Sequence, residues 1–276
     1  MEDFWVLKLV NQSSNILQAR MEDSFNQLKL AKIKAEKVRG EKINNLNINA
    51  SSILVFNNES GAVFDKNADQ LRPIASLTKL ITALVAKDIY DNSQIIEIDK
   101  KTVDQEGLSD FKIGDKVSVK NLISQMLIES SNDAAYALTL PITEKAFVDL
   151  MNLKAKEIGL RNTRFFNVTG LDPDNPRGFY NISTANDLAT LANYILKNQP
   201  EIFQITANRD FAEQSTNELL IDYPEIVGGK TGTTPAAGEC FLVVMQKPNK
   251  QDYYVNVLLN SKDRFSDMRK IIEILR

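Results

Sequence analysis

The sequence predicts an α+β fold, in which segments near both ends of the chain build one antiparallel sheet and a helical insert of about residues 95–215 lies between them. Two observations lead to this prediction. Short segments rich in β-branched and aromatic residues occur at 50–69 and again at 226–260. The chain between them has the apolar spacing and the cap residues of helices. We expect this domain to span residues 48–276, with residues 1–47 as a separate helical extension or linker.

The extension has a helical pattern of its own. The basic run KLAKIKAEKVRGEK lies near its end, and we expect a helix from about residue 14 to 39. This helix could be a solvated or dimer-forming extension, or its basic face could associate with a membrane surface. The start MEDFWVLKLVNQ lacks the basic residues and the continuous apolar stretch of a secretory signal, and no apolar run reaches the roughly 18 residues of a membrane span. The apolar residues at helical spacing are Leu17, Met21, Phe25 and Leu28.

The domain begins with a predicted β-hairpin. In ASSILVFNNESGAVFDKNAD, the segments ILVF and AVF have the composition of strands, and NNESG between them supplies turn residues. Pro73 then sets the φ angle at the entrance of a helix. We expect the buried face of that helix to contain Ile81, Leu84 and Val85.

The later elements have recognisable ends. EKAFVDLMNLKAKEIG closes on Gly159, a typical C-cap, and Thr184 with Asp187 predicts a capping box before the helix DLATLANYILKN. IVGGKTGTT, CFLVVMQ and YYVNVLLN predict three strands joined by the turns PAAG and KPNKQD. One face of a closing helix contains Phe265, Met268, Ile272 and Leu275.

The composition excludes several classes of function. The 276 residues are 43% hydrophobic and 25% charged, as in an ordinary globular protein, and a net charge of −3 gives no basic surplus for nucleic acid. The single cysteine excludes an internal disulfide and a thiolate zinc cluster. The chain has no histidine, which excludes a Ser-His-Asp triad and any histidine-ligated metal. If the protein is a hydrolase, its base is therefore a lysine or a carboxylate, and we expect no metal or cofactor.

Three short motifs occur in a suggestive order. The SxxK motif Ser76/Lys79 opens an apolar helix in PIASLTKLITALV, Ser130/Asn132 lies on a turn between helices, and Lys230-Thr231-Gly232 lies on a Gly-rich strand. Taken alone, SxxK is weak, because a helix cap beside a snorkelling lysine gives the same letters. A second SxxK copy at 109–112 lies in a polar loop where nothing would hold the two side chains together. The order and the context make the set specific.

The first motif suits a nucleophile and its base. Residues three apart on a helix share a face, so the amine of Lys79 can reach the hydroxyl of Ser76. To act as a base near neutral pH, Lys79 must lower its pKa from roughly 10.4 toward 7. Burial and a second cation both disfavour an ammonium, and Lys230 is the obvious second cation.

With these motifs the chain resembles the penicillin-recognising serine enzymes, and among them the low-molecular-weight D-alanyl-D-alanine carboxypeptidases. The resemblance runs from about Ile48 to Arg276 and includes RPIASLTKL, FNVTGLD, ISTANDLATL, GGKTGTTPAAGECFL and SKDRFSD. It implies a β-lactamase/transpeptidase-like fold. Residues 1–47 fall outside it.

The resemblance also implies a role for each site residue. Ser76 would be the nucleophile, Lys79 its base and Ser130 the proton relay to the leaving amine. The backbone N–H groups of Ser76 and Thr233 would form the oxyanion hole. Residues that would bind the substrate are Asn132, Lys230, Thr231, Gly232, Thr233 and Arg264.

The implied activity is a serine DD-peptidase. Its substrate would be the peptidoglycan stem peptide, with β-lactam antibiotics as covalent inhibitors, and its location would be extracytoplasmic. An endopeptidase acting on cross-links would use the same machinery. A class A β-lactamase needs a glutamate in the loop after the helical region, and 161–184 contains none. A non-catalytic penicillin-binding scaffold would need no intact motifs.

Three further residues or segments have two interpretations each. Arg264 either holds the substrate carboxylate, as the resemblance implies, or lies on the surface in the first turn of the last helix. Cys240 heads an apolar strand, and we expect it in the core. The acidic segment DPDN at 172–175 is a solvated loop or a cation site.

Overall fold

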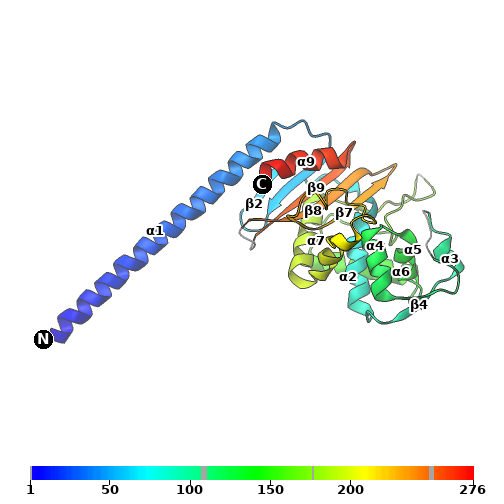
Figure 1. Cartoon of the computed structure of the whole chain (residues 1–276), viewed down its shortest axis with the longest axis horizontal. Coiled ribbons are helices and arrows are strands. Elements are labelled where there is room, and N and C mark those ends of the chain that lie inside the picture. Colours follow the sequence, from blue (N-terminus) through cyan, green and yellow to red (C-terminus); the bar gives the residue numbers. More distant parts are fainter. Residues whose placement is uncertain (1, 107–110, 176, 249–251) are drawn as a thin grey trace.

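The computed structural model describes residues 2–106, 111–175, 177–248 and 252–276, and the side chains of residue 18 and of those from 21 onward within these ranges. The second SxxK copy begins at Ser109, which lies outside the described residues. At the centre of the domain is a five-stranded antiparallel sheet in the order β2-β1-β9-β8-β7 (Figure 1). Its strands are β1 (Ser52–Asn57), β2 (Gly61–Lys66), β7 (Ile226–Thr234), β8 (Gly238–Gln246) and β9 (Tyr253–Ser261).

The sheet joins the two ends of the domain. The N-terminal hairpin strand β1 pairs with the C-terminal strand β9, so that Ile53 lies opposite Leu258. The strands predicted at 50–69 and 226–260 are therefore found in a single sheet, which confirms the predicted fold class. This pairing leaves β2 at one edge and β7 at the other.

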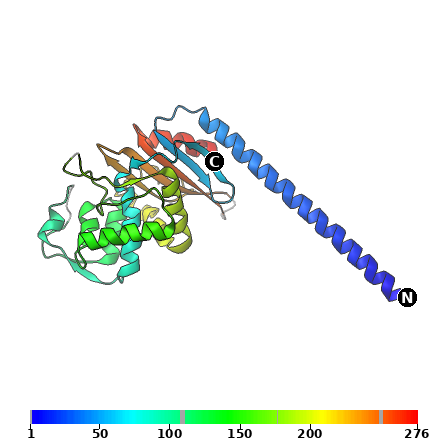
Figure 2. The ribbon, with the colours of Figure 1, turned by 180° about the vertical axis from the view of Figure 1, so that it is seen from behind.

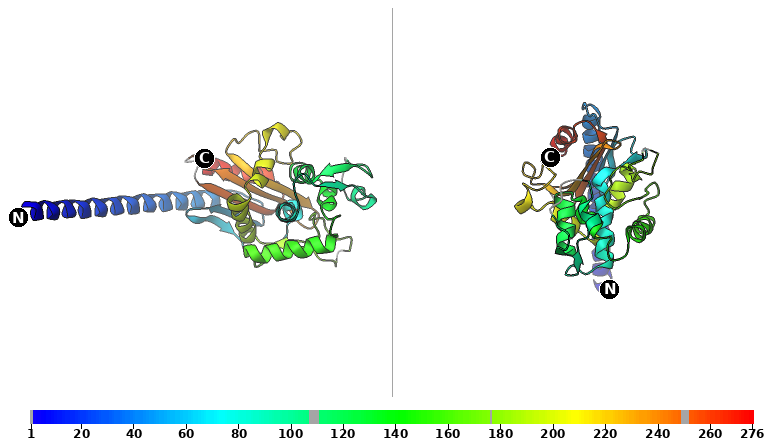
Figure 3. Two further views of the ribbon diagram at one scale, coloured as in Figure 1. Left: turned by 90° about the horizontal axis from the view of Figure 1, so that it is seen from below. Right: turned by 90° about the vertical axis from the view of Figure 1, so that its right-hand side faces the viewer.

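Both faces of the sheet are buried, and alternation along the strands divides the core in two. On β8, Cys240, Leu242 and Val244 face the helical part of the domain, while Phe241 and Val243 face the other side. Helix α9 (Arg264–Leu275) and the end of the N-terminal helix cover that second side, as two views of the ribbon show (Figures 1 and 3).

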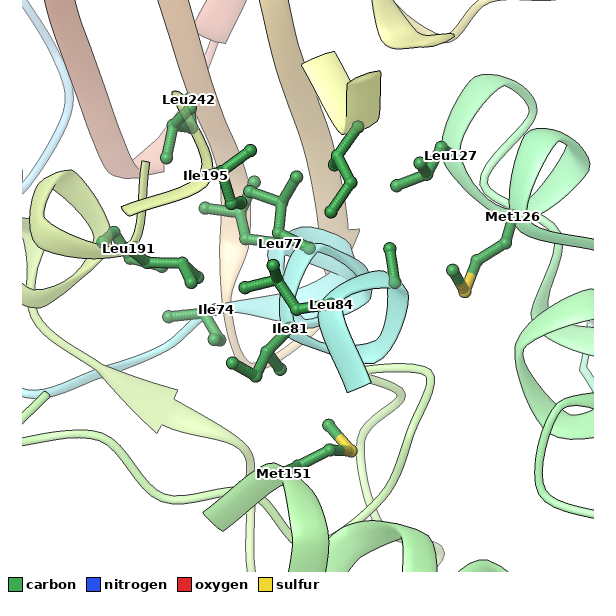
Figure 4. Close-up of a cluster of buried hydrophobic side chains, with 14 of the residues drawn as sticks. Ile74, Leu77, Ile81, Leu84, Met126, Leu127, Met151, Leu191, Ile195 and Leu242 are labelled. Carbon is green, nitrogen blue, oxygen red and sulfur yellow. The ribbon is translucent and has the colours of Figure 1, made fainter. Parts of the chain in front are cut away.

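Helix α2 (Lys79–Ile89) runs through the middle of the larger core cluster. Ile81, Leu84 and Val85 are buried as expected. In Figure 4, the labelled residues of α2 lie between those of α4 (Val119–Ile128) and α7 (Ala185–Asn198), with α6 (Glu144–Ile158) below them. The start of α2 is therefore held firmly beside the sheet.

The insert is mainly, but not entirely, helical. Besides α4, α6 and α7 it contains α3 (Lys100–Val103), α5 (Asn132–Ala137) and α8 (Glu201–Thr206). Strand β4 (Ile95–Glu97) pairs with β5 (Lys116–Ser118), and β6 (Ile182–Ser183) pairs with β3 (Arg72–Pro73). These pairs involve only two or three residues each, and such short pairs have too little periodicity to be seen in sequence.

The predicted caps are found, one of them in modified form. Gly159 ends α6 in the left-handed conformation, with φ of 89°. Thr184 accepts a hydrogen bond from the Asp187 N–H at 3.1 Å. The Asp187 carboxylate instead accepts from the Asn162 N–H and the Thr163 hydroxyl, both at 2.7 Å. Because a tertiary contact recruits this carboxylate, the capping box has this one bond.

Helix α1 (Glu2–Asn44) is longer than the predicted 14–39 and projects from the domain as a rod (Figures 1 and 2). Neither glycine nor proline occurs before Gly40, so nothing in the sequence stops the helix earlier. Its last turns pack against the edge strand: a Cβ on Gly40 would lie 2.2 Å from the Val63 carbonyl oxygen. The buried Glu36 accepts hydrogen bonds from Tyr254 at 2.8 Å and from Lys247 at 2.9 Å. These contacts fix α1 to the domain and cover edge strand β2.

Among the described residues, no helix combines the length and the apolar character that crossing a membrane requires.

Candidate active site

Ser76 lies in a tight turn between the sheet and α2. The predicted helix begins here as a 3₁₀ turn, η1 (Ala75–Thr78), in which Ala75 has a φ of 47°. Strand β7 passes directly against this turn, because a Cβ on Gly232 would lie 2.8 Å from the Ser76 nitrogen. Glycine is therefore required at this position, and the backbone of β7 lies beside Ser76.

Lys79 has three hydrogen-bond partners and no contact with solvent. Its Nζ lies 2.8 Å from Ser76 Oγ, 2.7 Å from Asn132 Oδ1 and 2.8 Å from the Thr169 carbonyl oxygen. The side chain is fully buried. Burial holds the pKa of Lys79 well below its usual value of 10.5, and the positive charge of Lys230 lowers it further.

These partners orient the neutral amine. A neutral lysine has two N–H donors and one lone pair, and Asn132 Oδ1 and the Thr169 carbonyl can only accept. Both N–H groups therefore point at these two oxygens, and the lone pair points at Ser76. In this state the Ser76 hydroxyl donates to the amine, which is the arrangement of a nucleophile with its base.

The second motif meets the third. Lys230 donates to Ser130 Oγ at 2.8 Å and to the Thr231 carbonyl at 3.0 Å. Burial, with a smaller contribution from Arg264, lowers the pKa of Lys230 to about 7. Ser130 adopts a left-handed conformation, with φ of 64°, on the turn between α4 and α5.

The remaining predicted residues line the same edge of the sheet. Thr231 Oγ1 lies 2.6 Å from Thr216 Oγ1, and Thr233 is exposed. Arg264 Nη1 donates to the Gly232 carbonyl at 3.1 Å and to the Thr233 hydroxyl. The guanidinium therefore reaches back to β7 and does not point away from it in the first turn of α9.

The structure brings all nine predicted site residues together around the end of β7. It also adds groups that the motifs did not predict. The Thr169 carbonyl that accepts from Lys79 belongs to FNVTGLD, a segment to which the family resemblance assigns no role. Thr216 lies outside the three ordered motifs. Because the Thr169 contact is a backbone contact, no side-chain pattern could have indicated it.

Two other expectations concern residues near the site. Cys240 is buried in the core as expected, and burial raises the pKa of its thiol to about 11. Asp172 of the DPDN segment accepts from the Thr234 hydroxyl at 2.8 Å and from the Ala236 N–H at 2.9 Å. Its carboxylate therefore holds the end of β7. Across the part of the chain that the structure describes, no group of three acidic or cysteine side chains could hold a metal ion.

Comparison with known proteins gives a consistent set of similarities. The family model described as D-alanyl-D-alanine carboxypeptidase (Peptidase_S11) matches residues 32–263. The chain is 31% identical over 216 residues to D-alanyl-D-alanine carboxypeptidase DacF of Bacillus subtilis, covering 72% of this chain and 54% of that protein. It is 34% identical over 219 residues to the D-alanyl-D-alanine endopeptidase of Escherichia coli, covering 72% and 68%. The chain thus spans about half the length of the Bacillus relative.

Solved structures share the fold. The D-alanyl-D-alanine carboxypeptidase DacD of Francisella tularensis has a TM-score of 0.74 at 27% identity, covering 84% of this chain and 70% of that one. Penicillin-binding protein D2 of Listeria monocytogenes, in its cefotaxime-bound form, has a TM-score of 0.73 at 30% identity, covering 83% and 98%.

Proposed function

Because the chain belongs to the D-alanyl-D-alanine carboxypeptidase family, we propose that it is a serine DD-peptidase, which removes the terminal D-alanine of peptidoglycan stem peptides. One observation carries the proposal: the amine of the fully buried Lys79 lies 2.8 Å from the hydroxyl of the half-buried Ser76. A solvated lysine would stay protonated at neutral pH. Burial instead makes the amine a base that can take the proton of Ser76.

In the acylation step, Lys79 takes the hydroxyl proton as Ser76 Oγ attacks the carbonyl carbon of the penultimate D-alanine. The N–H groups of Ser76 and Thr233 hold the negative oxygen of the tetrahedral intermediate. Ser130 then gives its hydroxyl proton to the leaving nitrogen and receives the proton held by Lys79, which returns Lys79 to its neutral form. The C–N bond breaks, and D-alanine leaves with its amine. Lys230 keeps Ser130 in place through its 2.8 Å bond.

In the second step, water attacks the ester on Ser76. Lys79 takes a proton from this water and returns one to Ser76 Oγ as the C–O bond breaks. The products are the shortened peptide with a free carboxylate and the original enzyme. The segment 161–184 offers no glutamate as a separate base for this step, so we propose that it is slow with a bound β-lactam.

Substrate binding would use the edge of β7. The terminal carboxylate would meet Lys230, Arg264 and the hydroxyls of Thr231 and Thr233, because a carboxylate prefers charged and hydroxyl donors. The side-chain amide of Asn132 would donate to the peptide. The absence of a side chain at Gly232 would let the peptide lie along the strand edge.

The decisive test uses a fluorescent penicillin. The wild-type protein should form a stable covalent adduct, Ser76→Ala should form none, and Ser109→Ala should form the wild-type amount. Rapid turnover of the penicillin would indicate a β-lactamase, and the absence of any adduct would indicate a non-catalytic scaffold. Incubation with a pentapeptide stem should then release free D-alanine.

An endopeptidase activity is the second candidate, because two of the similar proteins carry that name. Cleavage of a cross-linked muropeptide, measured beside release of D-alanine, separates the two activities. The stronger activity identifies the main substrate.

We propose an extracytoplasmic location, because peptidoglycan lies outside the cytoplasm. We also propose that the basic part of α1 lies against an anionic membrane surface, with Lys29, Lys32, Lys34 and Lys37 exposed. The protein should then sediment with phosphatidylglycerol vesicles at low salt and not with neutral vesicles. Equal binding to both would contradict the membrane proposal.

A further inference from the structure

The Thr169 carbonyl, which orients the Lys79 amine, lies on a loop whose position must itself be fixed. This loop, residues 165–172, approaches the Ser76 turn closely: a Cβ on Gly170, which has a φ of 87°, would lie 2.0 Å from the Ala75 carbonyl oxygen. A shift of the loop by a fraction of an ångström would therefore change the 2.8 Å contact between Thr169 and Lys79. Two asparagines hold it in place.

Asn167 shapes the turn that contains Thr169. Its Oδ1 accepts from the Gly170 N–H at 2.7 Å, from the Thr169 N–H at 3.2 Å and from the Thr169 hydroxyl at 3.3 Å. Its Nδ2 donates to the Leu171 carbonyl at 3.0 Å. One side chain thus closes the turn and fixes the direction of the Thr169 carbonyl.

Asn181 joins that turn to the nucleophile. Its side chain is 3% exposed and uses both ends of the amide. Oδ1 accepts from the N–H groups of Phe166 and Asn167 at 2.6 and 3.2 Å, and Nδ2 donates to the Asn167 carbonyl at 2.9 Å. Nδ2 also lies 3.0 Å from the hydroxyl of Thr78, two residues after Ser76.

The backbone of Asn181 holds the other side of the same turn. Its carbonyl accepts from the Ile74 N–H at 3.2 Å, two residues before Ser76. Asn181 therefore contacts the chain on both sides of Ser76 and, through Asn167, the carbonyl that receives one N–H of Lys79. A second buried side chain, Thr82, also joins the two segments, since its hydroxyl lies 2.8 Å from the Val168 carbonyl and 3.3 Å from the Thr78 carbonyl. Asn181 differs from Thr82 because it bonds to Asn167, the residue that fixes the Thr169 carbonyl.

From this arrangement we infer that Asn181 is a positioning residue for acylation: it fixes the Thr169 carbonyl relative to Ser76, so that the lone pair of Lys79 points at the hydroxyl. The inference rests on the proposed function, because it assigns Asn181 to the same acyl transfer. Asn181 is not hydrogen-bonded to Ser76 Oγ or to the Lys79 amine, so its effect passes through the Thr169 carbonyl and through the turn that contains Ser76.

The test compares Asn181→Leu with a matched control, Asn152→Leu. Asn152 holds the same loop by the same kind of bonds, accepting from the Phe165 N–H at 3.0 Å and donating to its carbonyl at 2.8 Å. It lies on α6, however, and its hydrogen bonds go to Phe165 and Val148 and not to the Ser76 turn. Both substitutions are neutral, and neither touches Lys230, the charged group acting on Lys79.

The measurement is the rate of acylation by a fluorescent penicillin between pH 5 and pH 10, with the adduct amplitude counting the active molecules. For Asn181→Leu we expect a fall of about 10- to 100-fold in the rate per active molecule. The ascending limb of the pH–rate profile of Asn181→Leu should move to lower pH, because losing the Thr169 acceptor removes a hydrogen bond that favours the ammonium form of Lys79. For Asn152→Leu we expect a rate within twofold of wild type and an unchanged pH profile.

The inference is overturned if Asn181→Leu, like the control, loses thermal stability but keeps the wild-type rate and pH profile. If Asn181→Leu does not fold, Thr78→Val takes its place, since it removes only the Thr78 acceptor; a fall of threefold or more supports the inference, and an unchanged rate overturns it. A wild-type protein that forms no adduct would refute the proposed function. The inference about Asn181 is refuted separately, when the wild-type protein forms the adduct and the variant forms it at the same rate.

Discussion

Replacing Lys230 by methionine should stabilise the fold at neutral pH while it abolishes efficient acylation. Lys230 is 2% exposed, and its pKa is lowered from 10.5 to about 7. The folded protein therefore holds this lysine in an environment that disfavours its charge. Methionine has a similar unbranched shape and no charge, so it fills the same space without that cost.

The magnitude follows from the two pKa values. The difference is about 3.5 units, and each unit corresponds to about 1.4 kcal/mol, so the cost at pH 7 is about 4 kcal/mol. The substitution also removes the hydrogen bonds to Ser130 and to the Thr231 carbonyl, each contributing about 1 kcal/mol. A net stabilisation of about 2 kcal/mol should remain, which raises the melting temperature of a domain of this size by several degrees.

The pH dependence gives the sharper check. Between about pH 7 and 10.5 the unfolded chain binds more protons at this lysine than the folded chain does, so wild-type stability rises with pH across this range. The advantage of Lys230→Met should therefore be largest at or below pH 7 and disappear near pH 9, because the charge cost falls by about 1.4 kcal/mol per pH unit until it equals the two lost hydrogen bonds. Urea unfolding of both proteins at pH 7 and at pH 9.5 measures it. A variant that is less stable than wild type at pH 7, or whose advantage does not decline with pH, would refute this reasoning.

Three further predictions follow from contacts around the sheet. Gly232→Ala should reduce the acylation rate by at least about 100-fold in a folded protein, because its Cβ would lie 2.8 Å from the Ser76 nitrogen of the proposed oxyanion hole. Labelling by a fluorescent penicillin measures the rate and circular dichroism checks the fold; a near-normal rate would contradict this prediction. Arg264→Gln should raise KM about 10-fold for a peptide with a free terminal carboxylate and much less for the amidated peptide; equal effects on the two peptides would exclude a carboxylate contact. Gly40→Leu should move α1 away from the Val63 carbonyl, because a Cβ would lie 2.2 Å from that oxygen. Hydrogen exchange should then show β2 amides at least about 10 times less protected, with the acylation rate unchanged, and unaltered protection would mean that α1 does not cover this edge.

Much of the fold could be predicted because it depends on local patterns. The strands around Ile53 and Leu258 have β-branched composition, and Gly159 occupies the left-handed cap that glycine favours. Predictions were less accurate where tertiary contacts compete with local ones. Asp187 turns its carboxylate to Asn162 and Thr163, so the capping box is half formed. Helix α1 runs from Glu2 to Asn44 because no breaker interrupts it and because Glu36 and Gly40 dock its end.

For the candidate site, the sequence by itself determined which chemical groups are available: without histidine and with a single cysteine, only a lysine or a carboxylate could activate Ser76. The spacing of Ser76 and Lys79 also follows from local geometry, because residues three apart share a helical face. Only the tertiary structure decided that Lys79 is placed and desolvated as the proposed base must be. Its neutrality depends on exclusion of water and on Lys230, and the direction of its lone pair depends on Asn132 and the Thr169 carbonyl, 53 and 90 residues away. Desolvation and hydrogen-bond direction depend on which distant segments surround an atom, and only the folded chain determines that.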